Sequence, residues 1–253
     1  MDLNLKGKVV VISGAAGHRG SIGEAMMRAI AREGGIPAIS DRNARGFGYV
    51  KELQAEGIDA AFFQTDVTKP DQIKAAVAGI VVKYGRIDVL INNASSFYPT
   101  PLQECSNEQW DDLVDSNLRA AFYLSQQLAP ELPRRAGSAV NMVDTHADNP
   151  RNGFPIYSIA KAGVKAMTKS LAKELAPRVR VNGVSPGAIL WPPSLEYESK
   201  PEVLLGRKKM LETIPLRVLG DPQNIADTVF FLANDACYVT GQTIRVDGGR
   251  YLG

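Results

Sequence analysis

Short, apolar, β-branched runs alternate with longer segments of helical period along the whole chain, and this alternation constrains the fold more than any other feature. The runs that predict strands are Val9–Ser13, Ile36–Ser40, Ala60–Gln64, Ile87–Ile91, Ser138–Val143, Arg180–Ser185 and Gln242–Val246. Between them, apolar residues that recur every three or four positions predict helices over Glu24–Glu33, Arg45–Glu56, Pro70–Tyr84, Asn107–Leu128, Tyr157–Glu174 and Gln223–Ala233. Strands that alternate with helices form right-handed crossovers, which produce a parallel sheet covered on both faces. We therefore expect an α/β fold, a doubly wound parallel sheet of about seven strands flanked by helices.

The chain shows no sign of division into separate domains. Its 253 residues contain no Gly/Ser-rich linker, repeat or low-complexity segment, so we expect a single domain over residues 1–253. One long irregular stretch, residues 188–209, is rich in proline and charge and is too long for a plain connection. We expect this stretch to form a lid over a substrate site.

Charge and cysteine content argue against several classes of function. A net charge of +2 without a basic run argues against a nucleic-acid partner. The two cysteines, Cys105 and Cys237, are too few for a disulfide framework and are typical of a reducing compartment. The N-terminus has no apolar signal region and no apolar run reaches membrane-spanning length, so we expect a cytoplasmic protein without a membrane partner. The two histidines, His18 and His146, lie in no pattern that indicates a metal site.

A glycine-rich loop follows the first expected strand. Glycines stand at positions 14, 17, 20 and 23, ahead of a helical segment. Strand, glycine loop and helix in this order form a Rossmann-like phosphate site, in which backbone N–H groups and a helix N-terminus hold a pyrophosphate. The literal G-x-G-x-x-G spacing is absent, so an ordinary flexible turn stays open as the alternative.

Polar residues follow the next three strands in turn. Asp41 ends the second strand, Asp66 ends the third, and Asn92–Ser95 end the fourth. Open α/β sheets bind ligands at the carboxyl ends of their strands, so these residues predict a nucleotide crevice. Asp41 would accept from ribose hydroxyls and repel a 2′-phosphate, which favours NADH, although Arg42 and Arg45 could offset its charge. The alternative for Asp41 is a solvated turn residue.

Tyr157 and Lys161 stand four residues apart on an expected helix, so their side chains project from one face. An ammonium group beside a tyrosine favours the phenolate, which lowers the tyrosine pKa and lets it exchange a proton near neutrality. Pairs of this kind also occur on ordinary helix surfaces. Because a nucleotide crevice is predicted earlier in the same chain, we expect Tyr157 and Lys161 to be catalytic residues.

Taken in order, these motifs resemble the short-chain dehydrogenase/reductase family over essentially the whole chain. The residues that carry the resemblance are Ser13–Gly23, Asp66–Val67, Asn92–Ser95, Ser116–Asn117, Tyr157 with Lys161, Ser185–Gly187 and Val246–Gly249. The resemblance implies hydride transfer to or from a nicotinamide cofactor, NAD(P)H, with Tyr157 as proton donor or acceptor. It implies that Lys161 binds the nicotinamide ribose and lowers the pKa of Tyr157, and that Asn117 holds a water molecule. The residues implied to contact the cofactor are Gly14, Arg19, Ser21, Ile22, Asp41, Arg42, Asp66, Val67, Asn93, Ala94, Tyr157, Lys161, Pro186, Gly187 and Ile189.

From Asn92 onward the chain resembles the pteridine reductases within that family. The matching stretches are NNASSFYPTP from Asn92, NMVD ending at Asp144, and AILWPP from Ala188. Asp144 stands 13 residues before Tyr157, where most of the family has a serine. The resemblance implies that Asp144 supplies or relays a proton to a dihydropteridine, with a pKa that rises if the pocket is dry. Further substrate contacts would come from Ser95, Phe97, Tyr157 and Trp191.

Alternatives stay open at this level. Asp144 could be a turn residue with Thr145 as the substrate hydroxyl, and Phe97 could be a core-filling aromatic. Pteridine reductases generally use NADPH, which Asp41 contradicts, and the loop Ser21–Gly23 is closer to the enoyl reductases of the same superfamily. The alternative function is an NAD-dependent sugar or alcohol dehydrogenase, or a ketoreductase.

A third alternative is a nucleotide-binding sensor without turnover, which the complete set of Asn117, Tyr157 and Lys161 disfavours because a sensor needs no proton relay. The family resemblance also implies a small-molecule substrate and a homotetramer, or a homodimer. In such an assembly the helices expected over Asn107–Leu128 and Tyr157–Glu174 would pair across a two-fold axis.

Overall fold

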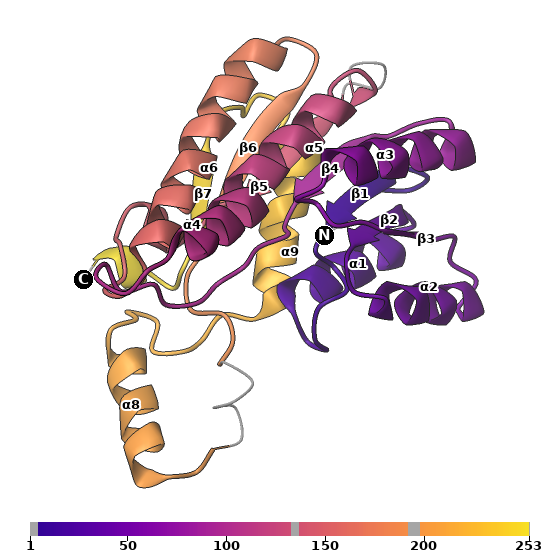
Figure 1. The fold of residues 1–253 in the computed structure, drawn as a ribbon. Helices are drawn as coiled ribbons and strands as arrows, with labels where there is room; N and C mark the ends of the chain where they lie inside the picture. Colours follow the sequence, from indigo (N-terminus) through magenta and orange to yellow (C-terminus); the bar gives the residue numbers. More distant parts are fainter. Residues whose placement is uncertain (1–4, 133–136, 192–197, 253) are drawn as a thin grey trace.

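A computed structural model of the chain describes residues 5–132, 137–191 and 198–252. Within them, one seven-stranded parallel sheet has the order β3-β2-β1-β4-β5-β6-β7 (Figure 1). The strands are β1 Val9–Ser13, β2 Ile36–Asp41, β3 Ala61–Gln64, β4 Val89–Asn92, β5 Ser138–Met142, β6 Arg180–Pro186 and β7 Thr243–Val246. The expected doubly wound parallel sheet is therefore confirmed.

Helices cover both faces of this sheet. One face packs against α1 (Ile22–Arg32), α2 (Arg45–Ala55) and α9 (Pro222–Phe230), and the other against α3 (Pro70–Tyr84), α5 (Ala120–Leu128) and α6 (Pro155–Leu175). Two further α-helices of the described ranges are α4 (Asn107–Val114) and α8 (Pro201–Glu212). None of the helices in the described ranges is both long and apolar enough to cross a membrane.

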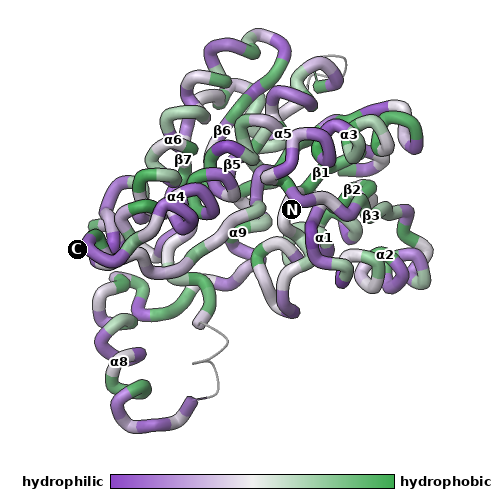
Figure 2. The backbone as a smooth tube through the Cα atoms, in the orientation of Figure 1, coloured by the Kyte–Doolittle hydropathy of each residue, from purple (hydrophilic) through white to green (hydrophobic). Residues whose placement is uncertain are grey.

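The inner strands β2, β1, β4, β5 and β6 are buried on both sides, which explains their nearly continuous apolar runs (Figure 2). In β1 every residue is buried. Val10 and Ile12 belong to the core beneath α1 and α9, whereas Val9 and Val11 belong to the core on the opposite face. Successive side chains of a strand point to opposite faces, so one short strand supplies both cores.

Strand order reverses direction between β1 and β4. The chain first builds outward from β1 to β2 and β3, and then returns to place β4 on the other side of β1. Open α/β sheets bind ligands beside the carboxyl ends of the strands at such a reversal. The fold therefore places a crevice between the loop that follows β1 and the loop that follows β4.

Helix boundaries differ from the expected ones where local chemistry sets them. The helix α1 begins at Ile22 rather than Glu24, because the Ser21 hydroxyl caps it by accepting from the backbone N–H of Glu24. The helix α6 begins at Pro155 rather than Tyr157, since proline suits the first helical position. The long helix expected over Asn107–Leu128 is divided into α4, a π-helical turn and α5.

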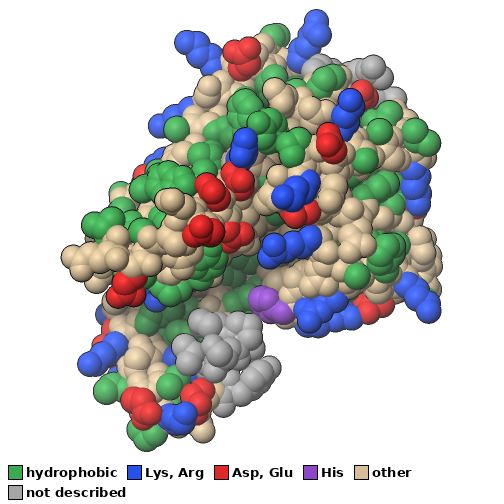
Figure 3. Space-filling view, in the orientation of Figure 1, with side chains coloured by type: hydrophobic (Ala, Val, Ile, Leu, Met, Phe, Trp, Pro, Cys, Tyr) green, Lys and Arg blue, Asp and Glu red, His purple; other side chains and the backbone are tan. Residues whose placement is uncertain are grey.

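The lid region contains a helix that was not expected. Residues 188–209 were predicted to be irregular, but α8 occupies Pro201–Glu212 and none of its residues is buried. The helix stands apart from the sheet as a small lobe, and in the space-filling view a hollow lined partly by hydrophobic side chains separates this lobe from the body (Figures 1 and 3). Residues 192–197 of the expected lid lie outside the described residues.

Candidate active site

Two neighbouring cavities lie along the carboxyl edge of the sheet. The smaller one, about 290 Å³, is lined by residues that follow β1 to β4, including Gly14, Asp41, Arg42, Asp66, Val67 and Ala94. The larger one, about 800 Å³, is lined by residues that include Ile22, Phe97, Asp144, Tyr157, Lys161, Pro186, Gly187, Ile189 and Trp191. Asn93 and Ser95 line both cavities. Most of the residues expected in the site are thus brought to one edge of the molecule.

The glycine loop and the loop after β4 are held against each other. Gly14 has a positive φ of 71°, and a Cβ atom there would lie 2.5 Å from the Ala94 Cα, so only glycine fits. The Asn93 amide donates to the Gly14 carbonyl at 2.8 Å, and the Ser13 hydroxyl accepts from the Asn93 N–H at 3.0 Å. These contacts fix the floor of the crevice at the point where the strand order reverses.

The Asp41 carboxylate holds the glycine loop through hydrogen bonds to backbone N–H groups. Its Oδ2 accepts from the backbone N–H of Ala16 and its Oδ1 from the backbone N–H of Asn43, both at 2.8 Å. The residue is 9% exposed and lines the smaller cavity, so it is not a solvated turn residue. Its carboxylate both organises the loop and faces the space where a ribose would lie.

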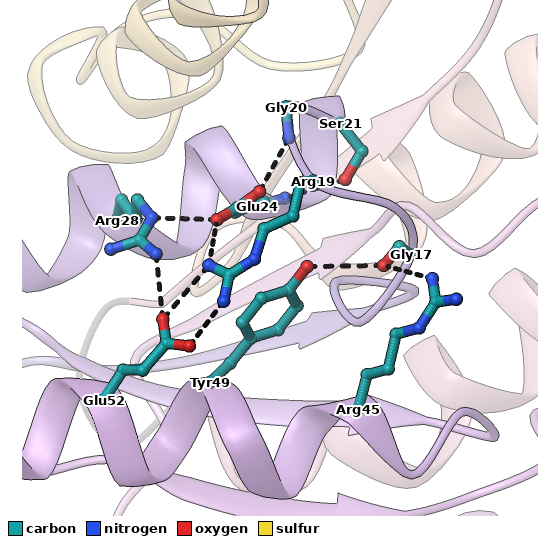
Figure 4. A network of polar contacts seen from close by, with 9 residues as sticks. All are labelled: Gly17, Arg19, Gly20, Ser21, Glu24, Arg28, Arg45, Tyr49 and Glu52. Atoms are coloured by element: carbon teal, nitrogen blue, oxygen red, sulfur yellow. Dashed lines mark hydrogen bonds and ion pairs between the residues drawn. The ribbon is translucent and has the colours of Figure 1, made fainter. Parts of the chain in front are cut away.

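Arg19 and Ser21 line neither cavity, contrary to expectation. The Arg19 guanidinium lies between the carboxylates of Glu24 and Glu52 and packs 4.7 Å from the centre of the Tyr49 ring (Figure 4). Two carboxylate partners already neutralise this guanidinium and direct it toward α2. In this arrangement the charge of Arg19 ties the loop to α2, and a cofactor contact from Arg19 stays a prediction.

The Tyr157 hydroxyl donates a hydrogen bond to Asp144 Oδ2 at 2.9 Å. The Lys161 ammonium donates to the Met142 carbonyl at 2.9 Å and lies 5.6 Å from the centre of the Tyr157 ring. Asp144 Oδ1 accepts from the backbone N–H of His146 at 2.8 Å. The ring Nδ1 of His146 lies 2.9 Å from the same oxygen, an ion-pair distance outside hydrogen-bond geometry. Asp144 is thus the hub that joins Tyr157 to His146.

The protonation of this cluster differs from the expected one. Burial, and next the negative charge of Asp144, raise the pKa of Tyr157 well above its ordinary value, so the net shift is upward and not the downward shift expected from Lys161. Burial lowers the pKa of Lys161 to about 8, although Asp144 acts in the opposite direction. Burial alone would raise the pKa of Asp144, but His146 and Lys161 outweigh it and the net shift is downward. The site therefore pairs a protonated phenol with an ionised carboxylate.

Aromatic side chains form one wall of the larger cavity. The Phe97 ring stacks on Phe154 at 4.7 Å and 15°, and meets the Tyr157 ring edge-on at 4.7 Å. Phe97 is 49% exposed, so it does not fill the core. Trp191 contributes a second aromatic surface to the same cavity. A flat or apolar substrate would find stacking partners here.

Asn117 supports the site from behind and lines neither cavity. It lies in the π-helical turn Asp115–Arg119, a feature frequent near functional sites. Its amide donates to the carbonyls of Leu113 and Ser96 at 2.9 Å, and its oxygen accepts from the Ser95 hydroxyl at 2.7 Å. In this arrangement Asn117 positions the loop after β4.

Two residues of the cavity were not singled out from the sequence. His146 stands two positions after Asp144, and that spacing alone could have indicated a backbone and side-chain partner for the carboxylate. Arg207 projects from α8 into the larger cavity, and nothing in the sequence signals it because the helix itself was not expected. The described residues contain no group of three or more His, Cys, Asp or Glu side chains placed to hold a metal ion.

Comparison with known proteins identifies the family. A sequence profile described as enoyl-(acyl carrier protein) reductase matches residues 14–250. The 3-oxoacyl-(acyl-carrier-protein) reductase FabG of Thermotoga maritima is 40% identical over 253 residues, which is 98% of this chain and 99% of that protein. The chain belongs to the short-chain dehydrogenase/reductase family. A FabG of Staphylococcus epidermidis is 36% identical over 97% of this chain and 99% of that protein.

Solved structures of this family agree with the fold. A short-chain dehydrogenase/reductase from Brucella melitensis, titled glucose/ribitol dehydrogenase, covers 100% of both chains with a TM-score of 0.88 and 29% identity. A putative gluconate dehydrogenase from Agrobacterium tumefaciens covers 99% of this chain and 98% of that chain, with a TM-score of 0.90 and 28% identity. These names support the dehydrogenase and ketoreductase alternative better than the pteridine reductase expectation, for which they offer no support.

Membership of the short-chain dehydrogenase/reductase family implies a nicotinamide dinucleotide, and the crevice fits one. A Cβ atom on Gly20 would meet nothing within 4 Å, and Gly17 would meet only the Ser21 side chain, so space is left above the first turn of α1. Backbone N–H groups at a helix N-terminus attract phosphate oxygens. The loop Gly17–Ile22 would therefore hold the pyrophosphate, with the adenosine in the smaller cavity and the nicotinamide in the larger.

Proposed function

We propose that the protein is an NAD(P)H-dependent ketoreductase that reduces the carbonyl of a 3-oxoacyl-type compound to a secondary alcohol. The observation that carries this proposal is the Tyr157 hydroxyl, which lies at the wall of the larger cavity and keeps its proton beside an ionised Asp144. Carbonyl reduction needs a proton donor for the oxygen that becomes negative. The FabG names of the relatives support the substrate class.

A nicotinamide held in the larger cavity would supply a hydride to the carbonyl carbon, and the residues of the chain would supply the proton. Tyr157 Oη turns from Asp144 Oδ2 to the substrate oxygen and donates its proton there. Lys161, fully buried beside the ring, stabilises the phenolate that remains. Because Asp144 disfavours that phenolate, the tyrosine recovers its proton readily and is ready for another reduction.

We infer a preference for NADH over NADPH. Asp41 places a carboxylate in the smaller cavity, where a 2′-phosphate would be repelled. Arg19, one of the residues that could offset this charge, is engaged by Glu24 and Glu52. Arg42 lines the cavity beside Asp41, and Arg45 donates to the carbonyl of Gly17, which lines the same cavity.

Reduction of a dihydropteridine is the second candidate, and two observations favour it. Asp144 takes the place of a neutral hydroxyl partner, and Phe97 offers a half-exposed ring beside Tyr157 on which a flat heterocycle could stack. The relatives' names favour the ketoreductase, so we keep the pteridine as the competing substrate in the test.

The test measures oxidation of NADH and NADPH in parallel with three acceptors: a 3-oxoacyl thioester, a neutral 3-oxo ester and a dihydropteridine. Faster turnover of the oxo compounds is expected. Turnover of the dihydropteridine alone would replace the proposed function with the second candidate. Cofactor binding without turnover of any acceptor would refute both.

We also propose that the protein forms a homotetramer. Helices α4, α5 and α6 present exposed apolar side chains, namely Trp110 (44% exposed), Phe122 (43%) and Ile159 (53%). Large apolar side chains on the outer face of neighbouring helices are typical of subunit contacts. The family resemblance supports pairing of these helices across a two-fold axis.

A further inference from the structure

Arg207 lines the larger cavity, and two nitrogen atoms of its guanidinium lack a hydrogen-bond partner among the described residues. Its Nε and Nη2 atoms have no solvent-exposed surface, and neither atom has a hydrogen-bond partner among the residues described. The guanidinium carbon lies 5.2 Å from the centre of the Trp191 ring, which holds the side chain over the cavity. A charged group withdrawn from water is costly to leave without a partner. The Nε and Nη2 atoms of Arg207 are therefore available to donate hydrogen bonds to a ligand in the larger cavity.

The surrounding charges point to the nature of that partner. Among the described residues, four cationic side chains line the larger cavity: Arg151, Lys161, Arg207 and Arg250. In the same described lining the one carboxylate is Asp144, which already accepts from Tyr157 and His146. A cleft lined mainly by one sign of charge concentrates ligands of the opposite sign. The cavity is therefore electrostatically suited to an anion.

We propose that Arg207 binds an anionic oxygen group of the substrate, a carboxylate or a phosphate, so that the substrate class is an oxo compound with an anionic end. This inference rests on the proposed function, because it assigns the opposite end of the substrate to Tyr157. The planar fork of arginine matches both anions with two parallel hydrogen bonds. The helix α8 thereby takes part in substrate selection, since it carries Arg207, which binds the negative charge of the substrate.

The kinetic test compares 3-oxo acids with their methyl esters, which remove the negative charge and keep the carbonyl. The wild type is expected to prefer the acid in kcat/KM. The variant Arg207→Met is expected to lower the ratio of acid to ester by about 10- to 100-fold, as the loss of a charged hydrogen-bond partner does. The control Lys208→Met removes a cation from the next position of α8, outside the cavity lining, and is expected to leave the ratio unchanged.

A binding test needs no turnover. The chain has two tryptophans, so Trp110→Phe leaves Trp191, beside Arg207, as the sole indole reporter. A saturable change in fluorescence is expected with the oxo acid but not with the ester, and Arg207→Met should abolish it. Separate titrations with acetate and inorganic phosphate distinguish a carboxylate from a phosphate as the preferred group.

Three outcomes overturn the inference. One is an equal response to acid and ester, and another is a ratio unaffected by Arg207→Met. The third is a rise in the KM for NADH or NADPH in that variant at an unchanged ratio, which would make Arg207 a contact to the cofactor phosphates. Failure of the proposed function is distinguishable, because neither the acid nor the ester would then be reduced although the anion still binds beside Trp191.

Discussion

At the scale of single residues, the site is governed by Asp144. The carboxylate accepts from Tyr157 on one oxygen and from His146 on the other, so its charge reaches every titrating group of the cluster. A neutral hydroxyl in its place would leave burial as the main cause that raises the pKa of Tyr157 and would remove the contribution of the negative charge. The identity of this one residue thus adds to how firmly the tyrosine holds its proton.

The variant Asp144→Asn tests this role through the pH profile. The negative charge of Asp144 raises the pKa of Tyr157 and opposes the downward shift of Lys161, so its removal lowers both. We expect the alkaline limb of kcat for carbonyl reduction to move to lower pH by about one unit or more. The control is Asp148→Asn, since Asp148 pairs with Lys165 and Arg245 instead. An unchanged alkaline limb in Asp144→Asn would contradict the assignment.

His146 provides a second test from the acid side. The groups that face the Asp144 carboxylate are His146, Tyr157 and Lys161. Because His146 helps to lower the pKa of Asp144, the variant His146→Ala should raise it, and protonation of Asp144 should then begin at higher pH. We expect the acid limb of kcat/KM to move toward neutrality, while the KM for the cofactor stays the same. A structural role alone would change stability without moving that limb.

Asp41 sets the cofactor preference at the same scale. Its replacement by alanine removes the charge that repels a 2′-phosphate, and we expect the ratio of kcat/KM for NADPH over NADH to rise about tenfold. Steady-state rates with both cofactors measure the ratio. The matched control is Arg19→Ala, which should leave the ratio as it is because the guanidinium lies between Glu24 and Glu52. A fall of the ratio in that control would place Arg19 at the phosphate after all.

At the scale of elements, the glycine loop is a rigid part of the site because several neighbours hold it. Asn93 fixes its start from the loop after β4, and Tyr49 donates to the Gly17 carbonyl at 3.3 Å from α2. The ion pairs of Arg19 with Glu24 and Glu52 join α1 to α2 around the same loop (Figure 4). The backbone N–H groups of such a loop are already oriented before the cofactor binds, which reduces the conformational entropy lost on binding.

Two glycines of the same loop, Gly14 and Gly17, differ in how much space their surroundings leave for a side chain. A methyl group on Gly14 would lie 2.5 Å from backbone atoms of Ala94, so Gly14→Ala should lower the free energy of unfolding by about 2 kcal/mol or more. A methyl group on Gly17 would make an ordinary 3.6 Å contact with Ser21, and Gly17→Ala should stay within about 0.5 kcal/mol of the wild type. Urea denaturation without cofactor measures both. Equal effects of the two substitutions would contradict the close approach of the loops.

At the scale of the whole molecule, one sheet edge joins the two cavities into a continuous site. Asn93 and Ser95 border both, so a dinucleotide can place its adenosine end beside β2 and β3 and its reactive end beside β5 and β6. The outward faces of α4, α5 and α6 carry the exposed apolar side chains Trp110, Phe122 and Ile159, on which the proposed assembly rests.

The assembly has its own prediction. The wild type is expected to sediment as a tetramer, and Phe122→Glu together with Ile159→Glu should yield smaller species, because charges would be buried in the contact. Val82→Glu on α3 replaces a side chain that is 87% exposed and serves as the control. Sedimentation of the wild type as a monomer would contradict the proposal.

The sequence predicts the sheet well and the electrostatics poorly, for physical reasons. Strands such as β1 and helices such as α3 follow from periodicity, since burial imposes the pattern on the chain locally. The partners of Arg19 and the pKa of Tyr157 depend on carboxylates from other elements, and no local pattern records them. The helix α8 was missed because no apolar side chain on it is fully buried, so that its sequence shows no clear apolar period.

The double duty of Asp41 restricts how this enzyme can change its cofactor. The carboxylate that would read the ribose also accepts the Ala16 N–H, so it is part of the loop's construction. A lineage or a designer that removes the carboxylate to admit a phosphate leaves that N–H without its acceptor in the same step. A change of preference from NADH to NADPH without loss of stability therefore takes two substitutions. One removes the negative charge that repels the 2′-phosphate, and the other supplies a new acceptor for the Ala16 N–H.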